Sequence, residues 1–188
     1  MRYCLFGASF DPPHIGHIEI IKHCINLFDK IIIMPVGQHP NKNLFANKND
    51  RFKMAEIVKR IIDSDKIILD DYEIKGTTNN YTFDTIKHIE GKYQLDSISL
   101  IIGSDQLNNI RKWYKNQYIL SNYQVYCFVR KNVNVKYKLN SNIKIIRDVN
   151  FDVSSSKIRN NIKFNKKFPG SWLSEEVWDY IEKKNIYR

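Results

Sequence analysis

The sequence predicts an α/β fold in which helices cover both faces of a parallel β-sheet. Short runs of β-branched and aromatic residues alternate along the chain with segments whose apolar residues recur at helical spacing. Strands that alternate with helices pair in parallel, because each helix returns the chain to the same end of the sheet. The 188 residues are 43% hydrophobic and 27% charged, which supplies a core without disulfides. We therefore expect one doubly wound domain over residues 1–188.

Six apolar runs are predicted to be buried strands, because each is short and rich in β-branched or aromatic residues. They are Tyr3–Phe6, Ile31–Met34, Ile67–Leu69, Ile98–Ile102, Val125–Val129 and Ile143–Ile146. Helical spacing is found in three segments between them, Ile15–Asn26, Arg51–Ile62 and Thr82–Ile89. In the second of these, Phe52, Ala55, Val58 and Ile62 form one apolar stripe, which we expect to face the core.

The carboxyl-terminal part of the chain is predicted to be a small helical portion. A short helix is expected at Ser155–Asn161 and a last one at Glu175–Lys184. Ser174 suits the N-cap of the last helix, and two glutamates follow it in the first turn. Leu173 can pack on Trp178 as a hydrophobic staple, which would fix the start of this helix.

Composition limits both the location and the partners of the protein. Cys4, Cys24 and Cys127 lack CxxC spacing and are typical of reduced residues in a cytoplasmic protein. The longest aliphatic run, Ile31–Val36, is far shorter than the ~20 residues of a membrane span, and no export signal is evident. A net charge of +10 favours an anionic partner, although AT-rich coding would also produce it. Because no basic stripe is interleaved with aromatic residues, we expect neither nucleic acid nor a membrane as partner.

Glycine and proline concentrate in the segment Gly7–His17, GASFDPPHIGH, which follows the first strand and opens the first helix. In a parallel α/β sheet, ligands bind at the carboxyl ends of strands and beside helix N-termini. Gly7 lets a substrate approach the backbone, and Asp11 with the prolines shapes the turn. His14 and His17 lie three residues apart on one helical face, so both imidazoles can face one phosphate chain.

Other interpretations of this segment are weaker. A histidine pair at this spacing could hold a metal ion, but no third Cys, His or carboxylate stands at ligand spacing. Two exposed histidines without a role would leave the surrounding glycines and prolines unexplained. The segment also lacks GxGxxG and GxxxxGK[ST], which disfavours a dinucleotide-binding Rossmann site and a P-loop. The prediction is therefore a site for a phosphate chain.

Two motifs together resemble the nucleotidylyltransferase superfamily. GASFDPPHIGH resembles its [ST]-F-D-P-x-H-x-G-H signature, and Val153–Arg159, VSSSKIR, resembles its I-S-S-T-x-I-R element. The resemblance implies a Rossmann-like fold of the nucleotidylyltransferase type with a small helical carboxyl-terminal portion. It also places Ser155, Ser156 and Arg159 at phosphate oxygens. Arg159 suits this role because a guanidinium can contact phosphate in a bidentate way that lysine cannot copy.

The middle of the chain resembles the bacterial-type nicotinate mononucleotide adenylyltransferases. Pro35–Lys42 is similar to the P-x-x-x-P-x-K loop of that family, and Arg51–Met54 is similar to its R-x-x-M. Further matches are Glu73 with Asn80–Thr85, similar to E…S-Y-T-x-x-T, and Ile102–Asp105 with Trp113 and Tyr114, similar to G-x-D…W. The chain departs from the usual residues at Ala8, Ser9, Asn80 and Ser156, which bears on substrate preference and not on reaction class.

The resemblance implies that ATP and nicotinate mononucleotide react to give nicotinate adenine dinucleotide and pyrophosphate, a step toward NAD. The implied catalytic residues are His14, His17 and Arg159. ATP would be bound by Gly7, Ala8, Ser9, Phe10, His14, His17, Gly103, Asp105, Ser155, Ser156 and Arg159. The mononucleotide would be bound by Lys42, Tyr81, Thr82, Thr85, Trp113 and Tyr114. Mg²⁺ would arrive with ATP, because no carboxylate cage is evident. A homo-oligomer is left open.

The residues themselves allow two interpretations at several of these positions. Asp105 can accept ribose hydroxyls or cap the next helix, and Trp113 can stack on a pyridine ring or belong to the core. Lys42 can contact phosphate or stand on the surface. The backbone N–H groups near Tyr81–Thr85 can bind a carboxylate. A related transferase with nicotinamide mononucleotide or pantetheine phosphate as acceptor is the alternative within this class, and a basic nucleic-acid-binding module is the alternative outside it.

Overall fold

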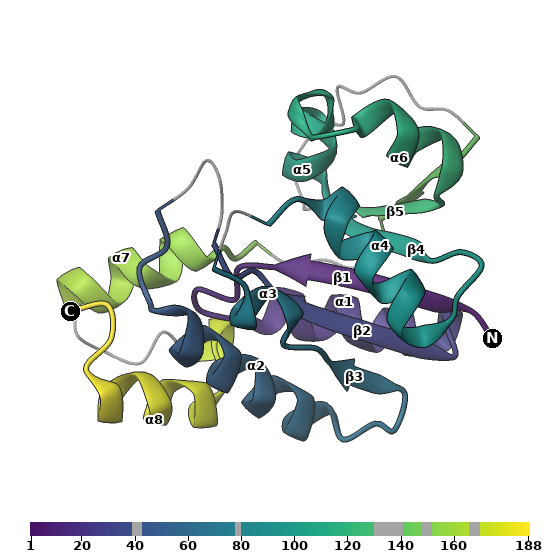
Figure 1. Ribbon diagram of the computed structural model, residues 1–188. Coiled ribbons are helices and arrows are strands. Elements are labelled where there is room, and N and C mark those ends of the chain that lie inside the picture. The colour runs from purple at the N-terminus through teal and green to yellow at the C-terminus, as the bar shows by residue number, and fades with distance from the viewer. Residues whose placement is uncertain (39–42, 78–79, 130–140, 148–151, 166–169) are drawn as a thin grey trace.

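The computed structural model describes residues 1–38, 43–77, 80–129, 141–147, 152–165 and 170–188. Within these ranges six parallel strands form one sheet, in the order β3-β2-β1-β4-β5-β6 (Figure 1). The strands are β1 Tyr3–Ala8, β2 Lys30–Pro35, β3 Ile67–Leu69, β4 Ser99–Gly103, β5 Val125–Phe128 and β6 Ile143–Ile146. All six predicted strands are confirmed, with ends that differ by two residues at most.

Helices connect the strands and follow the last of them. They are α1 Ile15–Leu27, α2 Lys48–Ile62, α3 Tyr72–Lys75, α4 Thr82–Tyr93, α5 Ser104–Asn109, α6 Asn116–Asn122, α7 Ser155–Asn165 and α8 Glu175–Lys184. Two 3₁₀ helices lie at Ile110–Lys112 and Gly170–Trp172. The five predicted helices are confirmed as α1, α2, α4, α7 and α8. Sequence analysis missed α3, α5 and α6, because four to seven residues are too few for an apolar period to repeat.

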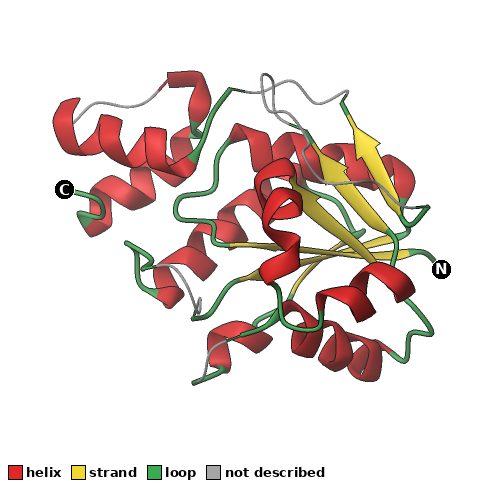
Figure 2. Cartoon of the chain, turned by 90° about the horizontal axis from the view of Figure 1, so that it is seen from above, coloured by secondary structure: helices red, strands yellow, loops and turns green. Residues whose placement is uncertain are grey.

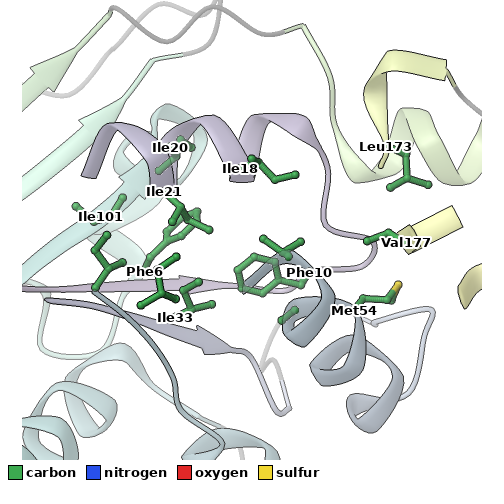
Figure 3. Close-up of a cluster of buried hydrophobic side chains, with 14 of the residues drawn as sticks. Phe6, Phe10, Ile18, Ile20, Ile21, Ile33, Met54, Ile101, Leu173 and Val177 are labelled. Atoms are coloured by element: carbon green, nitrogen blue, oxygen red, sulfur yellow. The ribbon is translucent and has the colours of Figure 1, made fainter. Parts of the chain in front are cut away.

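Two hydrophobic clusters, one on each face of the sheet, confirm that the fold is doubly wound. One joins the sheet to α1, α2, α7 and α8, and the other joins it to α4, α5 and α6. Figure 2 shows helices on both sides of the strands. In Figure 3, Ile21 of α1 lies near Phe6 of β1 and Ile33 of β2, while Met54 and Val177 close the far end of the cluster. The four central strands, β2, β1, β4 and β5, are thus covered by apolar side chains on both faces, whereas Lys144 of the edge strand β6 is exposed.

The apolar stripe predicted for α2 is wrong in detail. The buried residues are Arg51, Met54, Ala55 and Val58, whereas Phe52 and Ile62 are only half-buried. The helix is rotated from the predicted orientation because the Arg51 side chain turns inward and donates hydrogen bonds to loop carbonyls. An apolar pattern alone could not reveal this, because it counts arginine as a surface residue.

Helix α8 begins and ends as the sequence predicts. The Ser174 hydroxyl accepts a hydrogen bond from the backbone N–H of Val177 at 3.4 Å, so Ser174 is the N-cap. Leu173 and Trp178 pack into the same hydrophobic cluster, in accord with the predicted staple.

Of the helices that the structure describes, none combines the length and apolar character that crossing a membrane requires.

After β3 the chain crosses back over β1, and its later strands are added on the other side of β1. Strands β2 and β3 are added on one side of β1, and β4, β5 and β6 follow on the other side. The segment that follows β1 and the segment that follows β4 therefore leave the sheet toward opposite faces. A crevice opens between them at the carboxyl ends of these two strands. This is where a ligand site is expected in such a sheet.

Candidate active site

The loop after β1 holds the two histidines of the first motif against each other. His14 is extended, with φ −145°, and is the N-cap of α1, so it precedes the helix that carries His17. The ring centroids of His14 and His17 are 3.9 Å apart. The backbone N–H of His14 donates to Nδ1 of His17 at 3.1 Å. Because Nδ1 accepts this bond, the proton of the neutral His17 ring is on Nε2, which is then a donor.

Phe10 supports this pair from the core. Its side chain is 1% exposed and its ring centroid lies 5.0 Å from that of His17. Phe10 also has a left-handed backbone, with φ 51°, an uncommon conformation for a bulky residue, at the point where the loop turns toward α1. The resemblance assigned Phe10 to ATP binding, and since its side chain packs against His17 in the core, only its backbone is left for that role, which stays a prediction.

Asp11 joins the first motif to two distant parts of the chain. Its side chain is buried, and its carboxylate accepts hydrogen bonds from the backbone N–H groups of Phe45 at 2.8 Å and Ala46 at 2.9 Å. The hydroxyl of Tyr187 donates to the same carboxylate at 2.8 Å. Burial and the nearby Asp11 raise the pKa of Tyr187, so the phenol keeps the proton that it donates. Sequence analysis gave Asp11 only a role in the turn, because its partners lie 34 to 176 residues away.

The second motif docks directly on the first. The hydroxyl of Ser155, at the start of α7, donates to the carbonyl of Pro12 at 2.9 Å. Arg159, one turn later, donates from Nη1 to the carbonyl of Asp11 at 2.6 Å and from Nη2 to the Ser156 hydroxyl at 3.0 Å. The structure thus brings together the two motifs that sequence analysis paired. These contacts turn the guanidinium toward the loop that carries the histidines.

A cavity of about 700 Å³ opens at the carboxyl ends of β1 and β4. This volume is within the range of small-molecule sites. The first motif contributes Gly7, Ala8 and Ser9 to its wall, and a Cβ at Gly7 would meet none of the described atoms within 4 Å. The missing side chain therefore leaves the backbone accessible from the cavity.

Asp105 forms the opposite wall with the start of α5. Its side chain is exposed and lines the cavity, and among the described residues it makes no N-cap hydrogen bond to α5. A Cβ at Gly103 would lie 2.7 Å from Oδ1 of Asp105, so the glycine allows the carboxylate to turn back toward the strand end. Of the two interpretations of Asp105, this geometry favours the one in which its carboxylate meets a ligand.

The far end of the cavity is lined by the residues assigned to the mononucleotide, Tyr81, Thr82, Thr85, Trp113 and Tyr114. Trp113 is half-buried, so part of its ring packs on the core while the rest borders the cavity. The rings of Tyr81 and Tyr114 lie 5.3 Å apart at the opening. Among the described residues no side chain caps the N-terminus of α4, which leaves its first N–H groups for a ligand. Lys42, also assigned to the mononucleotide, lies outside the described residues.

Glu73 is a buried carboxyl in the same cavity, and sequence analysis quoted it in a motif without assigning it to the site. It accepts hydrogen bonds from the Thr85 hydroxyl at 2.6 Å and the backbone N–H of Gly37 at 3.3 Å. Burial raises its pKa, and the hydrogen bonds from Thr85 and Gly37 partly offset this. A Cβ at Gly37 would lie 1.8 Å from the carbonyl oxygen of Glu73, so only glycine fits there. Glu73 thus fixes the loop after β2 against α4.

Arg51 holds the backbone of the first motif in place. Its guanidinium donates to the carbonyls of Ser9, Val36, Gly37 and Ala46, which belong to the loops after β1 and β2 and to the segment before α2. Burial lowers the pKa of Arg51, and the nearby carboxylate of Asp11 counters the shift. Sequence analysis noted Arg51 only within R-x-x-M. Its role was hidden because its guanidinium satisfies backbone carbonyls of several loops, and such contacts leave no signal in the sequence.

The model of the cytidylyltransferase-like family matches residues 5–161 of the chain, which include both motifs. The chain belongs to this family. A probable nicotinate-nucleotide adenylyltransferase of Fusobacterium nucleatum is 34% identical over 99% of the chain and 100% of its own length. Another, from Flavobacterium psychrophilum, is 31% identical over the full length of both proteins.

Solved structures confirm the fold of this cytidylyltransferase-like protein. The nicotinic acid mononucleotide adenylyltransferase of Plasmodium falciparum in complex with NaAD covers 99% of the chain and 97% of its own chain, with a TM-score of 0.76 and 20% identity. The same enzyme in complex with APC gives the same TM-score and identity. These likenesses confirm the predicted Rossmann-like fold of the nucleotidylyltransferase type.

Proposed function

We propose that the protein transfers the adenylyl group of ATP to nicotinate mononucleotide, with nicotinate adenine dinucleotide and pyrophosphate as products. The observation that carries the proposal is one continuous cavity at the switch between β1 and β4. Its wall contains Gly7, Ala8 and Ser9 of the first motif at one end and Trp113 with Tyr81 at the other. One nucleotide can lie at each end with its phosphate toward the other. The curated relatives, similar over their whole length, support the same reaction.

In this reaction a phosphate oxygen of the mononucleotide forms a bond to the α-phosphorus of ATP. The bond from that phosphorus to the bridging oxygen breaks, and pyrophosphate leaves with the electron pair. No covalent bond to the enzyme is needed, so the protein acts by positioning and by neutralising charge. Nε2 of His17 and the ring of His14 donate to the phosphate chain, and Arg159 holds the departing pyrophosphate.

Mg²⁺ enters this proposal as part of the ATP substrate. The carboxylate of Asp11 already accepts three hydrogen bonds from the protein, so it is poorly placed to bind a cation as well. Magnesium commonly keeps substrate phosphates and water as most of its ligands. When bound, it would neutralise phosphate charge.

The decisive test is release of pyrophosphate from ATP with a panel of acceptors. The panel contains nicotinate mononucleotide, nicotinamide mononucleotide and pantetheine phosphate. We expect release with the first at a kcat/KM above that of the others, and formation of the dinucleotide by chromatography. Release only with pantetheine phosphate would assign the protein to a different transferase. No release with any acceptor would support a binding module instead.

Trp113→Ala is expected to raise KM for the mononucleotide about fivefold or more, with little change in KM for ATP. Stacking on the half-buried indole contributes ~1 kcal/mol beyond area burial, and this binding is shared by ground and transition states. Steady-state kinetics with each substrate varied in turn measures the effect.

Two variants control this experiment. Trp113→Phe retains a ring and is expected to lie between the wild type and the alanine variant. Trp172→Ala removes the same atoms from a half-buried site outside the cavity, and should leave both KM values unchanged. Equal increases in both KM values for Trp113→Ala would show that the residue serves only as core.

The acid is expected to be preferred over the amide by ~10- to 150-fold in kcat/KM. The N-terminus of α4 presents N–H donors, which a carboxylate satisfies with charge-assisted bonds, whereas an amide must place its NH₂ elsewhere. Asn80 could supply an acceptor for that NH₂. Its Oδ1, however, accepts a hydrogen bond from the backbone N–H of Gln38 at 3.1 Å, so it is already engaged by the protein.

Competition between the two mononucleotides at equal concentration measures this preference. Asn80→Ser restores the residue that is usual at this position in the resembled family and serves as the matched variant. We expect the preference for the acid to persist in both proteins. Equal consumption of acid and amide by the wild type would refute selection of the acid while leaving adenylyl transfer intact.

A further inference from the structure

Phe45 has an aromatic side chain that the proposed reaction does not use. It lies between β2 and α2, and 69% of the residue is exposed. Its backbone N–H donates to the Asp11 carboxylate at 2.8 Å, which fixes the residue beside the first motif. The Phe45 ring centroid is 4.1 Å from Cζ of Arg159, so the guanidinium lies against the ring. Phe45 therefore contacts both motifs although it belongs to neither.

Arg159 is held by hydrogen bonds, by the ring of Phe45 and by an ion pair in which Nη1 lies 4.0 Å from the Asp11 carboxylate. Hydrogen bonds to the Asp11 carbonyl and the Ser156 hydroxyl hold the edge of the guanidinium. These bonds still allow the plane to tilt, because hydrogen bonds to oxygen have a broad angular distribution. Cζ of the guanidinium lies over the ring of Phe45, 4.1 Å from its centroid, and the ring opposes this tilt. The hydrogen bonds and the ring together fix the plane of the guanidinium. Its remaining N–H groups can then meet a phosphate in that plane.

Exposure of one aromatic side chain is common and by itself indicates nothing. Phe164 of α7 provides a comparison within the same chain. It is 75% exposed, and Nζ of Lys163 lies 5.9 Å from its ring centroid. Phe45, by contrast, contacts both Asp11 and Arg159. What separates the two phenylalanines is thus their place relative to the guanidinium.

We propose that Phe45 is a positioning residue, whose ring holds the guanidinium plane of Arg159 ready for the departing pyrophosphate. This inference rests on the adenylyl transfer proposed above. A fixed plane reduces the entropy that Arg159 loses when it binds the leaving group, and this benefit is realised in the transition state. Loss of the ring should accordingly lower kcat and leave the binding of the mononucleotide unchanged.

The test is the kinetic effect of Phe45→Leu, Phe45→Tyr and Phe45→Trp, with Phe164→Leu as the control on α7. Cation–π contacts at exposed sites are weak, so we expect Phe45→Leu to lower kcat about 2- to 5-fold with KM for nicotinate mononucleotide unchanged. Tyrosine and tryptophan keep an aromatic face and should retain at least about half of the wild-type kcat. Phe164→Leu should match the wild type. Thermal melting checks that each variant is folded.

A double-mutant cycle shows whether the effect passes through Arg159. In an Arg159→Ala background, Phe45→Leu should cause no further loss of kcat, because the group that the ring positions is gone. An equal loss in both backgrounds would overturn the proposal, as would wild-type kcat for Phe45→Leu or failure of both aromatic variants. If the wild type itself gives no dinucleotide, the proposed function fails and this inference fails with it. A normal wild type with an unaffected Phe45→Leu variant refutes the inference alone.

Discussion

Replacing His17 with alanine is expected to lower kcat by ~10²-fold or more while the protein stays folded. Nδ1 of His17 accepts the backbone N–H of His14, which places the ring proton on Nε2 and makes that atom a donor for the phosphate chain. Removing one such preorganised donor typically costs ~10²- to 10³-fold in kcat, because the donor acts on charge that develops in the transition state. Steady-state kinetics with saturating ATP and mononucleotide measures the loss.

The control for this prediction is His23→Ala on the same helix. His23 packs edge-on against the ring of Phe128, and it is not part of the first motif. Its replacement should leave kcat within about twofold of the wild type, because it removes packing and no phosphate donor. Circular dichroism and thermal melting check both proteins. Near-normal turnover by His17→Ala would contradict the assignment of catalysis to the start of α1.

Arg159→Ala is expected to lower kcat by a similar factor, ~10²-fold, with a smaller change in KM for the mononucleotide. The guanidinium is the charged group that α7 brings to the first motif, and its two anchoring hydrogen bonds orient it before substrate arrives. Arg159→Lys should recover only part of the loss, since an ammonium cannot make the bidentate contact. Initial rates of pyrophosphate release quantify both variants.

Stability has to be separated from catalysis in this experiment. Arg159→Ala leaves the Asp11 carbonyl without its partner, which we expect to cost about 1–2 kcal/mol and to lower the melting temperature by ~2–8 °C. Lys157→Ala, on the same helix, removes an exposed ion pair with Asp152 and should leave both kcat and melting temperature nearly unchanged. If Arg159→Ala melts as predicted but turns over normally, Arg159 serves only to dock α7.

The strands and the longer helices could be predicted because their signals are local. A parallel strand that is buried on both faces is mostly apolar, and each of the six strands contains such a run, although Lys144 interrupts it in the edge strand β6. Helix α8 carries a capping serine, acidic residues in its first turn and basic residues in its last, so its bounds follow from adjacent residues. The short helices α5 and α6 carry no such signal, since fewer than two turns cannot display an amphipathic period.

The motifs predicted which residues would meet a ligand. They did not predict the contacts that hold the motifs in place. The carboxylate of Asp11, the guanidinium of Arg51 and the carboxyl of Glu73 each bind backbone groups far away in sequence. These side chains fix loops. Residues with this role do not recur at a regular spacing, so the sequence shows no pattern for them. Nor did the motif show that the side chain of Phe10 belongs to the core against His17.

The sequence by itself determined the six strands, the five longer helices and the two motifs whose resemblance implied the class of reaction, because each depends on residue types at short spacing. Only the tertiary structure decided that Ser155 and Arg159 lie on the Pro12 and Asp11 carbonyls, that Tyr187 reaches Asp11, and that Phe45 covers a guanidinium. These contacts join residues up to 176 positions apart. Such pairs meet through the packing of α7 and α8 on the first half of the sheet, and packing is a property of the whole chain that no local segment carries.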